Sequence, residues 1–437
     1  DPKLAKGLVK RDVVRIVPPG TNLDVQALEE SKNNYLMCVA YFTGKTGLSI
    51  ADVTTGDYYV TEVEDTKKLL DEINKYHPSE IICNDAFLMS GVDIEDLRNR
   101  LHITVYSLDP HYFDEDLCRK CLQKHFHVSS LIGLGLEEFA NGLIAAGGLM
   151  QYLYDTQKTS LAHFTHIDPY LTNKYMLLDS STRRNLELTE TLRGKEKKGS
   201  LLWVLDKTRT AMGARLLRSW LERPLLSVSA IARRSDAVAA LVKHTVQREE
   251  LILALTGIGD MERLMGRIVY GSAGGRDMVS LKNAMDHLPA IRQQLAAFEG
   301  GHLRELGARL DPLEDLAEVI GKTLQDDPPF SVREGEFIRD GFDGEVDRQR
   351  NILNHSAELL AQLEADTKEQ TGIKNMKIKS NKVFGYYIEV AKSQIDLVPD
   401  SWTRKQTTVN AERYISQELK ELEHAIMSAQ DTVTALE

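Results

Sequence analysis

Seven apolar residues near the C-terminal end of this chain recur at alternating intervals of four and three residues. They are Ile415, Leu419, Leu422, Ile426, Ala429, Val433 and Leu436. This heptad spacing predicts one long helix with a narrow apolar stripe. A second apolar series comes earlier in the chain, at Val346, Leu353, Leu360 and Leu363. We therefore expect two antiparallel helices, the outgoing one with about 27 residues and a length of about 40 Å.

A short basic stretch, residues 374–413, lies between the two helical patterns. It holds eight Lys or Arg residues against four Asp or Glu, although the whole chain has a net charge of −11. Met376 and Ile378 alternate with Lys377 and Lys379, which predicts a half-buried strand. We expect residues 380–382 to form a turn and residues 383–390 to form the next strand. The sequence thus predicts a small strand module at the tip of a helical arm.

The charge of this module suggests its partner. A basic patch on an acidic chain favours a polyanion that is met at one place. Short polar side chains suit hydrogen bonds to phosphate oxygens, and the module contains Ser380, Asn381, Thr407, Thr408 and Asn410. The alternative is a solvated hairpin whose lysines only keep it in solution, and residue types alone do not separate the two interpretations.

Two segments of the module resemble the clamp of the bacterial MutS family of DNA mismatch-repair proteins. They read NKVFGYYIEV, from residue 381, and RKQTTVNAERYISQELKELE, from residue 404. The resemblance extends over essentially the whole chain, and residues 177–188, 201–225 and 258–281 carry it best. It implies an α+β multidomain fold: an RNase H-like α/β connector domain, then a mainly α-helical core and lever whose long antiparallel helices carry a small β-rich clamp.

The resemblance also implies domain boundaries. We expect a linker at 1–21, the connector domain at 22–155, the helical core and lever at 156–372, the clamp at 373–416 and the start of the returning lever helix at 417–437. The linker resembles the segment that leaves the family's mismatch-reading domain, which this sequence lacks. The chain begins at Asp1 without methionine and stops at Glu437 within the heptad pattern. We therefore expect it to be a piece of a longer protein.

The resemblance points to six residues as contacts to the DNA backbone. Asn381 and Asn410 align with phosphate-contacting positions of the family's clamp, and the same motif contains Lys382, Arg404, Lys405 and Thr408. One departure is Val409, where the family usually has a lysine, and it removes one expected contact. We expect weak, salt-sensitive binding to double-stranded DNA without sequence preference. The competing hypothesis is a helical scaffold with a protein-binding tip and no DNA contact.

The N-terminal part of the chain alternates strand and helix patterns, which predicts a mixed sheet with helices on its faces. The expected strands are 35–42, 48–52, 57–63, 80–83 and 103–108, and the expected helices are 66–76 and 94–101. A metal-dependent nuclease on such a sheet would need carboxylates that converge on the metal. Asp52, Asp57, Asp85 and Asp109 lie near strand ends, and we interpret them instead as turn and cap residues.

The chain has four cysteines, a number that fits a reducing cytoplasm. Cys118 and Cys121 lie close to His125 and His127, which raises the possibility of a zinc site. The His-x-His spacing is not that of a standard structural site, and the segment is predicted to be helical. The favoured interpretation is therefore two partly buried thiols one helical turn apart, with no bound metal.

Residues 156–372 have the apolar period of helices. Their arginines include Arg183, Arg184, Arg215, Arg218, Arg263 and Arg267. We interpret most of these as polar faces of packed helices, whose side chains either snorkel to solvent or pair with Glu187, Glu222 and Glu262. Gly271, Gly274 and Gly275 predict one break between helices, and Pro312 and the pair Pro328-Pro329 predict two more.

Catalytic motifs are not found. A phosphate loop needs a glycine five positions before its Gly-Lys-Ser/Thr triplet. The two Gly-Lys-Thr triplets, at 44–46 and 321–323, have Val39 and Leu316 there. We expect no catalytic centre, no metal and no cofactor in this chain, although the resemblance implies ATP and Mg²⁺ in an ATPase domain that the sequence lacks.

Partners and location follow from the same resemblance. It implies a MutL-type partner on the connector domain and a homodimer formed largely through the missing ATPase domain. No run of 18 apolar residues occurs, so we expect no membrane span. A cytoplasmic location is expected.

Overall fold

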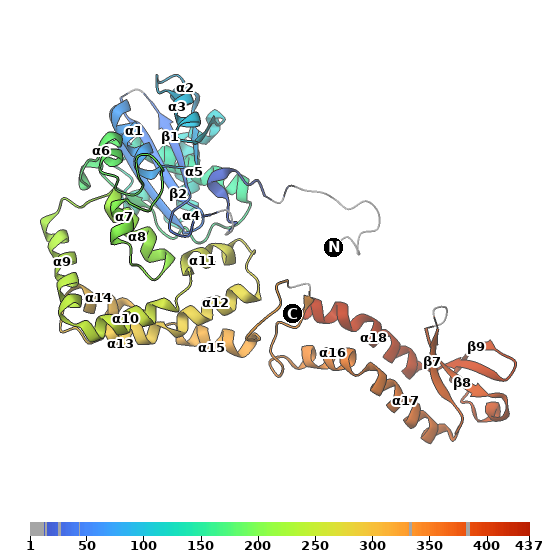
Figure 1. Ribbon diagram of the computed structural model, residues 1–437. Helices are drawn as coiled ribbons and strands as arrows, with labels where there is room; N and C mark the ends of the chain where they lie inside the picture. The colour runs from blue at the N-terminus through green and yellow to red at the C-terminus, as the bar shows by residue number, and fades with distance from the viewer. Residues whose placement is uncertain (1–12, 14, 25–27, 43, 332–333, 382–384) are drawn as a thin grey trace. The chain divides into compact units, whose positions relative to one another are not determined.

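The computed structural model describes residues 13, 15–24, 28–42, 44–331, 334–381 and 385–437. The chain divides into two compact units. The first unit comprises residues 1–273 with 280–317, and the second comprises residues 274–279 with 318–437. Figure 1 traces the chain through both units.

The first unit contains a six-stranded mixed sheet. Its strands are β1 (Tyr35–Tyr41), β2 (Thr46–Asp52), β3 (Asp57–Val63), β4 (Glu80–Cys83), β5 (Thr104–Ser107) and β6 (Asp168–Pro169). Their order is β5-β4-β1-β2-β3-β6. Strands β1, β2 and β3 are antiparallel, β4 and β5 run parallel to β1, and β6 runs parallel to β3. The predicted mixed sheet is confirmed, and β6 is a strand that the sequence did not predict.

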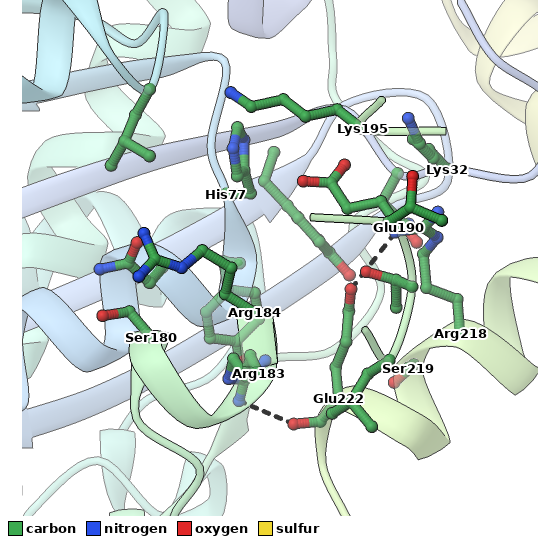
Figure 2. A pocket seen from close by; sticks show the side chains of 18 of the residues that line it. Lys32, His77, Ser180, Arg183, Arg184, Glu190, Lys195, Arg218, Ser219 and Glu222 are labelled. Atoms are coloured by element: carbon green, nitrogen blue, oxygen red, sulfur yellow. Dashed lines mark hydrogen bonds and ion pairs between the residues drawn. The ribbon is translucent and has the colours of Figure 1, made fainter. Parts of the chain in front are cut away.

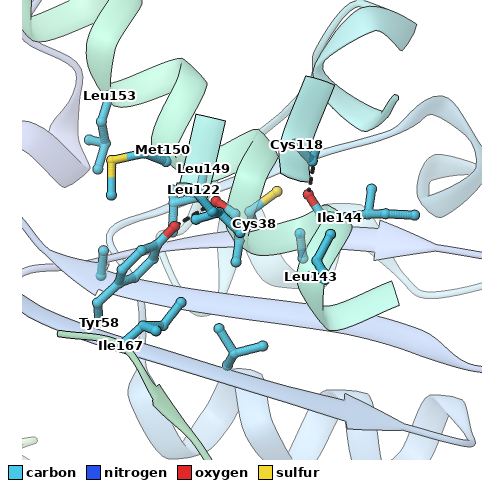
Figure 3. Close-up of a cluster of buried hydrophobic side chains, with 14 of the residues drawn as sticks. Cys38, Tyr58, Cys118, Leu122, Leu143, Ile144, Leu149, Met150, Leu153 and Ile167 are labelled. Atoms are coloured by element: carbon cyan, nitrogen blue, oxygen red, sulfur yellow. Dashed lines mark hydrogen bonds between the residues drawn. The ribbon is translucent and has the colours of Figure 1, made fainter. Parts of the chain in front are cut away.

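Helices cover both faces of this sheet. They are α1 (Thr66–Tyr76), α2 (Asp85–Leu88), α3 (Ile94–Asn99), α4 (Glu115–His125) and α5 (Ala140–Gln157). Side chains alternate between the faces of a strand, so Leu36 and Cys38 of β1 join the apolar cluster that includes α5. Met37 joins the cluster on the other face, with α1. Figure 3 shows the first of these clusters. The expected end of the connector domain, residue 155, falls inside α5.

Helix α5 approaches β2 very closely at Gly47. A Cβ atom at Gly47 would lie 1.9 Å from the backbone oxygen of Asn141 in the first turn of α5. The backbone N–H groups of Asn141 and Gly142 donate to Oε1 of Glu62 in β3, at 2.7 and 3.1 Å. This carboxylate satisfies two of the N–H groups that a helix start leaves free. The start of α5 is therefore fixed on the sheet.

The rest of the first unit is helical, as predicted. The helices are α6 (Ser180–Asn185), α7 (Leu201–Leu205), α8 (Ala211–Glu222), α9 (Val228–Lys243), α10 (Thr245–Thr256), α11 (Met261–Val269), α12 (Gly275–Asp286), α13 (Leu288–Ala296), α14 (Gly301–Arg309) and α15 (Glu314–Thr323), of which α12 and α15 continue into residues of the second unit. Short 3₁₀ helices cover Pro19–Thr21, Pro110–Phe113, Leu131–Leu134 and Thr172–Lys174 in this unit, and Lys392–Leu397 in the second unit. Gly271, Gly274, Pro312 and the pair Pro328-Pro329 lie between helices as predicted, whereas Gly275 is the first residue of α12.

The second unit consists of helices and a four-stranded antiparallel sheet. Its elements are α16 (Gly344–Asn354), α17 (Ser356–Thr371), β7 (Lys377–Asn381), β8 (Gly385–Ala391), β9 (Thr403–Thr407), β10 (Ala411–Ile415) and α18 (Gln417–Leu436). The strand order is β7-β8-β10-β9. Helix α18 packs against α16 and α17 (Figure 1), which confirms the predicted helix pair with a strand module at its tip. Together with the mixed sheet and the helices of the first unit, this confirms the predicted fold class.

The outgoing side of this pair differs from the prediction of one continuous helix. His355, with φ −118° and ψ 23°, separates α16 from α17. Asn354, His355 and Ser356 are all weak helix formers, whereas the apolar series on both sides keeps its helical spacing. Residues 380 and 381 of the predicted turn belong to β7, which continues to Asn381, and residue 382 lies outside the described residues. No helix within the described residues is both long and apolar enough to cross a membrane.

Candidate nucleic-acid interface

The small sheet of the second unit has one apolar face and one charged face. Ile388, Val390 and Tyr414 point into an apolar cluster with Leu419 at the start of α18. Their strand neighbours point the opposite way, because side chains alternate along a strand. Register pairs Lys377 with Glu389, Lys379 with Tyr387 and Arg413 with Glu389, so these residues share the outer face.

A single carboxylate organises the cations of this outer face. Nζ of Lys379 lies 2.7 Å from Oε1 of Glu389, and Nε of Arg413 lies 3.7 Å from Oε2. The hydrogen bond between Lys379 and Glu389 raises the pKa of the lysine and lowers that of the glutamate. The guanidinium of Arg413 also lies over the Tyr387 ring, 4.5 Å from its centroid. Lys377 lies opposite Glu389 in register, so the described residues of this face place three cations next to one anion.

Strand β9, at one edge of the sheet, carries two predicted site residues. Arg404 is paired in register with Tyr414, and its side chain is 64% exposed. Its nearest carboxylate is Glu412, at 3.5 Å, so the guanidinium is only loosely paired. The register of β9 and β10 shifts at this point, and Lys405 is exposed with no register partner in β10. Both cations are therefore accessible to a ligand at the sheet edge.

The turn between β9 and β10 holds two more predicted residues. Oγ1 of Thr408 donates to the backbone oxygen of Ala411 at 2.7 Å and accepts from its N–H at 3.2 Å. The Thr408 hydroxyl thus closes the turn, and its role in the structure is local. Asn410 is exposed, and so is Val409, at 85%.

Of the two remaining predicted residues, Asn381 lies at the end of β7. Asn381 is the last residue of β7, half-buried and opposite Gly385. Lys382 lies outside the described residues. Ala411, just after the β9–β10 turn, pairs with Ala391 at the far end of β8. Since each strand residue advances about 3.4 Å, Asn381 and the β9–β10 turn lie about 20 Å apart along the sheet.

The predicted residues thus spread over two ends and one edge of the sheet and do not form a single cluster. Sequence reasoning did not include Lys377, Lys379 and Arg413 in the site. The alternation of Lys377 and Lys379 with apolar residues was visible in the sequence, and it places both on the polar face. Arg413 could be added only with the register of β8 and β10, which the sequence does not show.

The structure disfavours the nuclease hypothesis. Asp52 and Asp57 face each other at one end of the β2–β3 hairpin, whereas Asp85 and Asp109 follow β4 and β5 at the opposite end of the sheet. Asp52 accepts hydrogen bonds from Asn33, Asn34 and Thr54. Asp52 is therefore a turn residue, as the sequence suggested, and the four carboxylates do not converge.

The candidate zinc ligands Cys118 and His125 make hydrogen bonds to other protein groups. Cys118 is buried and its thiol donates to the backbone oxygens of Tyr112 and Ile144. Both ring nitrogens of His125 have partners, at Tyr154 and Phe164. Among the described residues, no group of three or more His, Cys, Asp or Glu is placed to hold a metal ion.

Comparison with known proteins identifies two family domains. MutS domain II matches residues 34–167 and MutS domain III matches residues 181–435. Two curated relatives, both named DNA mismatch repair protein MutS, come from Lachnoclostridium phytofermentans and Ruminiclostridium cellulolyticum. They are 52% and 45% identical over the whole of this chain. The chain spans 47% and 50% of their lengths, about half of each relative. The chain therefore belongs to the MutS family.

Proposed function

We propose that this chain serves in DNA mismatch repair and that the sheet of its second unit binds the phosphate backbone of double-stranded DNA. The observation that carries the proposal is the exposed edge strand β9, where Arg404 is loosely paired and Lys405 has no partner in register. The name of the relatives supports a role in mismatch repair, and the positive charge of the strand module supports DNA as its ligand. Contacts to phosphate position a duplex without reading its sequence.

The spread of cations over the sheet suits a duplex better than a small anion. A DNA duplex presents phosphates along its whole length, about one charge per 1.7 Å of helix axis. Protein side chains separated by about 20 Å along one sheet can contact several of these phosphates at the same time. Asn410 and Asn381 would add neutral hydrogen bonds at the two turns. Thr408 contributes by holding the turn that presents Asn410.

Salt-dependent duplex binding tests the proposal. If Lys382, Arg404 and Lys405 all engage, log K should fall against log salt with a slope of roughly −2 to −3. Lys405→Ala should flatten the slope by about one unit and weaken matched and mismatched duplexes alike. Asn410→Ala should lower affinity without changing the slope. Lys243→Ala, which removes the same charge from the end of α9, is the matched control.

Two results would overturn the proposal. Affinity that stays constant between about 50 and 200 mM salt would exclude phosphate contacts. A Lys405→Ala variant that discriminates among sequences would show base reading. In either case the helical scaffold with a protein-binding tip becomes the better account. The exposed side chain of Val409 at the tip would then be the first surface to test.

Family membership supports two further partners of the complete protein. We propose that a MutL-type protein contacts the sheet of the first unit and that the complete protein forms a homodimer. Cross-linking tests the first proposal, since a MutL protein should attach within residues 34–167. Attachment only to the second unit would contradict it. Sedimentation of the full-length protein tests the second.

A further inference from the structure

A polar cavity of about 320 Å³ lies in the first unit. Figure 2 shows it from close by. Residues before β1 and at the ends of α1 and α3 form one side, and α6, α8 and the segment after α6 form the other. Among the described residues that line it, seven are Lys or Arg and only two, Glu190 and Glu222, are carboxylates. The cavity therefore has an excess of positive charge.

Some of these cations are neutralised by carboxylates that do not line the cavity. The pairs are Arg215 with Asp260, Arg100 with Asp96, and Lys32 with Glu29. Within the described residues, the other four cations, Arg183, Arg184, Lys195 and Arg218, form no ion pair with a carboxylate outside the cavity. Glu72 and Asp71 attract Arg183 only from a longer range. These four cations decide what the cavity can bind.

Two of these four cations, Arg183 and Arg218, contact Glu222. Arg183 donates to the backbone oxygens of Leu178 and Glu222, at 2.9 and 2.7 Å, and neither of these oxygens carries a full charge. Nη1 of Arg218 lies 3.4 Å from the Glu222 carboxylate. Nε of Arg218 is buried with no acceptor among the described residues. The Glu222 carboxylate thus contacts Arg218, whereas Arg183 contacts backbone oxygens, and Nε of Arg218 is a buried donor left unused.

The other two cations have no partner within the part of the chain that the structure describes. Arg184 and Lys195 line the cavity from α6 and from the segment before α7, and both are exposed. His77, at the end of α1, also lines the cavity. Burial lowers the pKa of its imidazole, whereas nearby Glu190 raises it and Lys32 and Lys195 lower it. An anion placed here would meet uncompensated charge together with the hydroxyls of Ser180 and Ser219.

We propose that this cavity binds a small anion that carries phosphate groups, of the size of pyrophosphate or a mononucleotide. Guanidinium groups match phosphate oxygens in pairs, and hydroxyls add hydrogen bonds. The volume is at the lower end of the range for small-molecule sites and excludes a duplex. Because its walls come from both the sheet and the helices of the first unit, the ligand would link the two.

Titration calorimetry of the full chain with sodium pyrophosphate tests this site. We expect saturable binding with a Kd below about 1 mM. The double variant Arg184→Ala with Lys195→Ala should weaken binding at least about tenfold. Arg193→Ala is the matched control, because Arg193 is an exposed cation in the same segment that does not line the cavity. Pyrophosphate should also raise the Tm of the parent chain and of the control.

Three results would overturn the proposal. The first is no saturable binding of pyrophosphate, and the second is equal weakening by Arg193→Ala. The third is displacement of bound pyrophosphate by duplex DNA that persists in the Lys405→Ala variant, which would indicate a surface for nucleic acid. The proposal does not depend on DNA binding by the second unit, because its readout is pyrophosphate alone.

Discussion

The guanidinium of Arg215 and the carboxylate of Asp260 form a two-pronged ion pair, with Nη1 2.6 Å from Oδ2 and Nη2 2.8 Å from Oδ1. Arg215 lies in α8, and Asp260 caps the start of α11. Nη1 of Arg215 also donates to the backbone oxygen of Glu30, in the segment before β1. With its side chain only 4% exposed, Arg215 joins the helical part of the first unit to its sheet.

Arg215→Ala should destabilise the first unit by about 3 kcal/mol, because it removes the closest charge partner of the Asp260 carboxylate. The other cation near this carboxylate, Nε of Arg263, lies 3.8 Å away. Arg233→Ala is the control, since Arg233 and Glu305 form an exposed ion pair that should contribute less than about 1 kcal/mol. Urea unfolding measures the difference. In a Trp402→Phe background the fluorescence of the remaining tryptophans, Trp203 and Trp220, reports only on the first unit. Equal losses for the two variants would contradict the assigned role of Arg215.

Gly47→Ala should cost at least about 3 kcal/mol, because overpacking against backbone atoms cannot be relieved by a side-chain rotation. The added Cβ would lie 1.9 Å from the backbone oxygen of Asn141, so α5 would have to move away from β2. At Gly133 a Cβ atom meets nothing within 4 Å, and Gly133→Ala should change stability by less than about 1 kcal/mol. Urea unfolding followed by the same tryptophan fluorescence compares the stability of the two variants. A mild effect at Gly47 would show that α5 shifts at little cost.

Local sequence signals predicted the elements of this fold well. The helix over 66–76 was predicted with its observed ends, because Asp65 caps its start and the apolar residues Leu69 and Ile73 keep helical spacing. The break at His355 was not predicted, since the apolar residues on both sides keep the same spacing. Periodicity records which face is buried, and a single break leaves that pattern almost unchanged.

Ion pairs between residues far apart in the sequence were harder to predict, and this limits the prediction of the site most. The sequence suggested carboxylate partners for the arginines, and Glu262 and Glu222 do pair with Arg215 and Arg218. The main partner of Arg215, however, is Asp260, which sequence reasoning did not consider. Glu187 instead accepts from the N–H of Leu192 in a turn. Residue types indicate that a charge needs a partner, and only the fold decides which one.

His163 should make the stability of the first unit depend on pH. Burial lowers the pKa of its imidazole to about 4. Its Nε2 lies 3.0 Å from the backbone oxygen of Val53, while Nδ1 is buried with no partner among the described residues. The unfolded chain therefore takes up a proton near pH 6.5 that the folded chain takes up only near pH 4. Stability should fall by about 3 kcal/mol as pH falls through this window and should be fully present above it.

His163→Gln keeps a donor for Val53 and removes the titrating group. Its free energy of unfolding should therefore fall less than that of the parent chain between pH 7 and pH 4, by about 3 kcal/mol. His166→Gln, an exposed histidine three positions along, should follow the parent chain. Parallel pH profiles for the parent and His163→Gln would show that His163 becomes protonated without cost in the folded state.

Glu389→Gln should strengthen binding to double-stranded DNA. Its carboxylate holds Lys379 at 2.7 Å and Arg413 at 3.7 Å on the outer face of the small sheet. Removing this negative charge releases both cations and removes repulsion of phosphate. Affinity should therefore rise at low salt, and the slope of log K against log salt should steepen by up to about one unit for each cation that engages. Glu369→Gln makes the same charge change on the exposed side of α17 and should have little effect. A gain of affinity cannot arise from misfolding, so unchanged or weaker binding by Glu389→Gln would place the duplex away from this face.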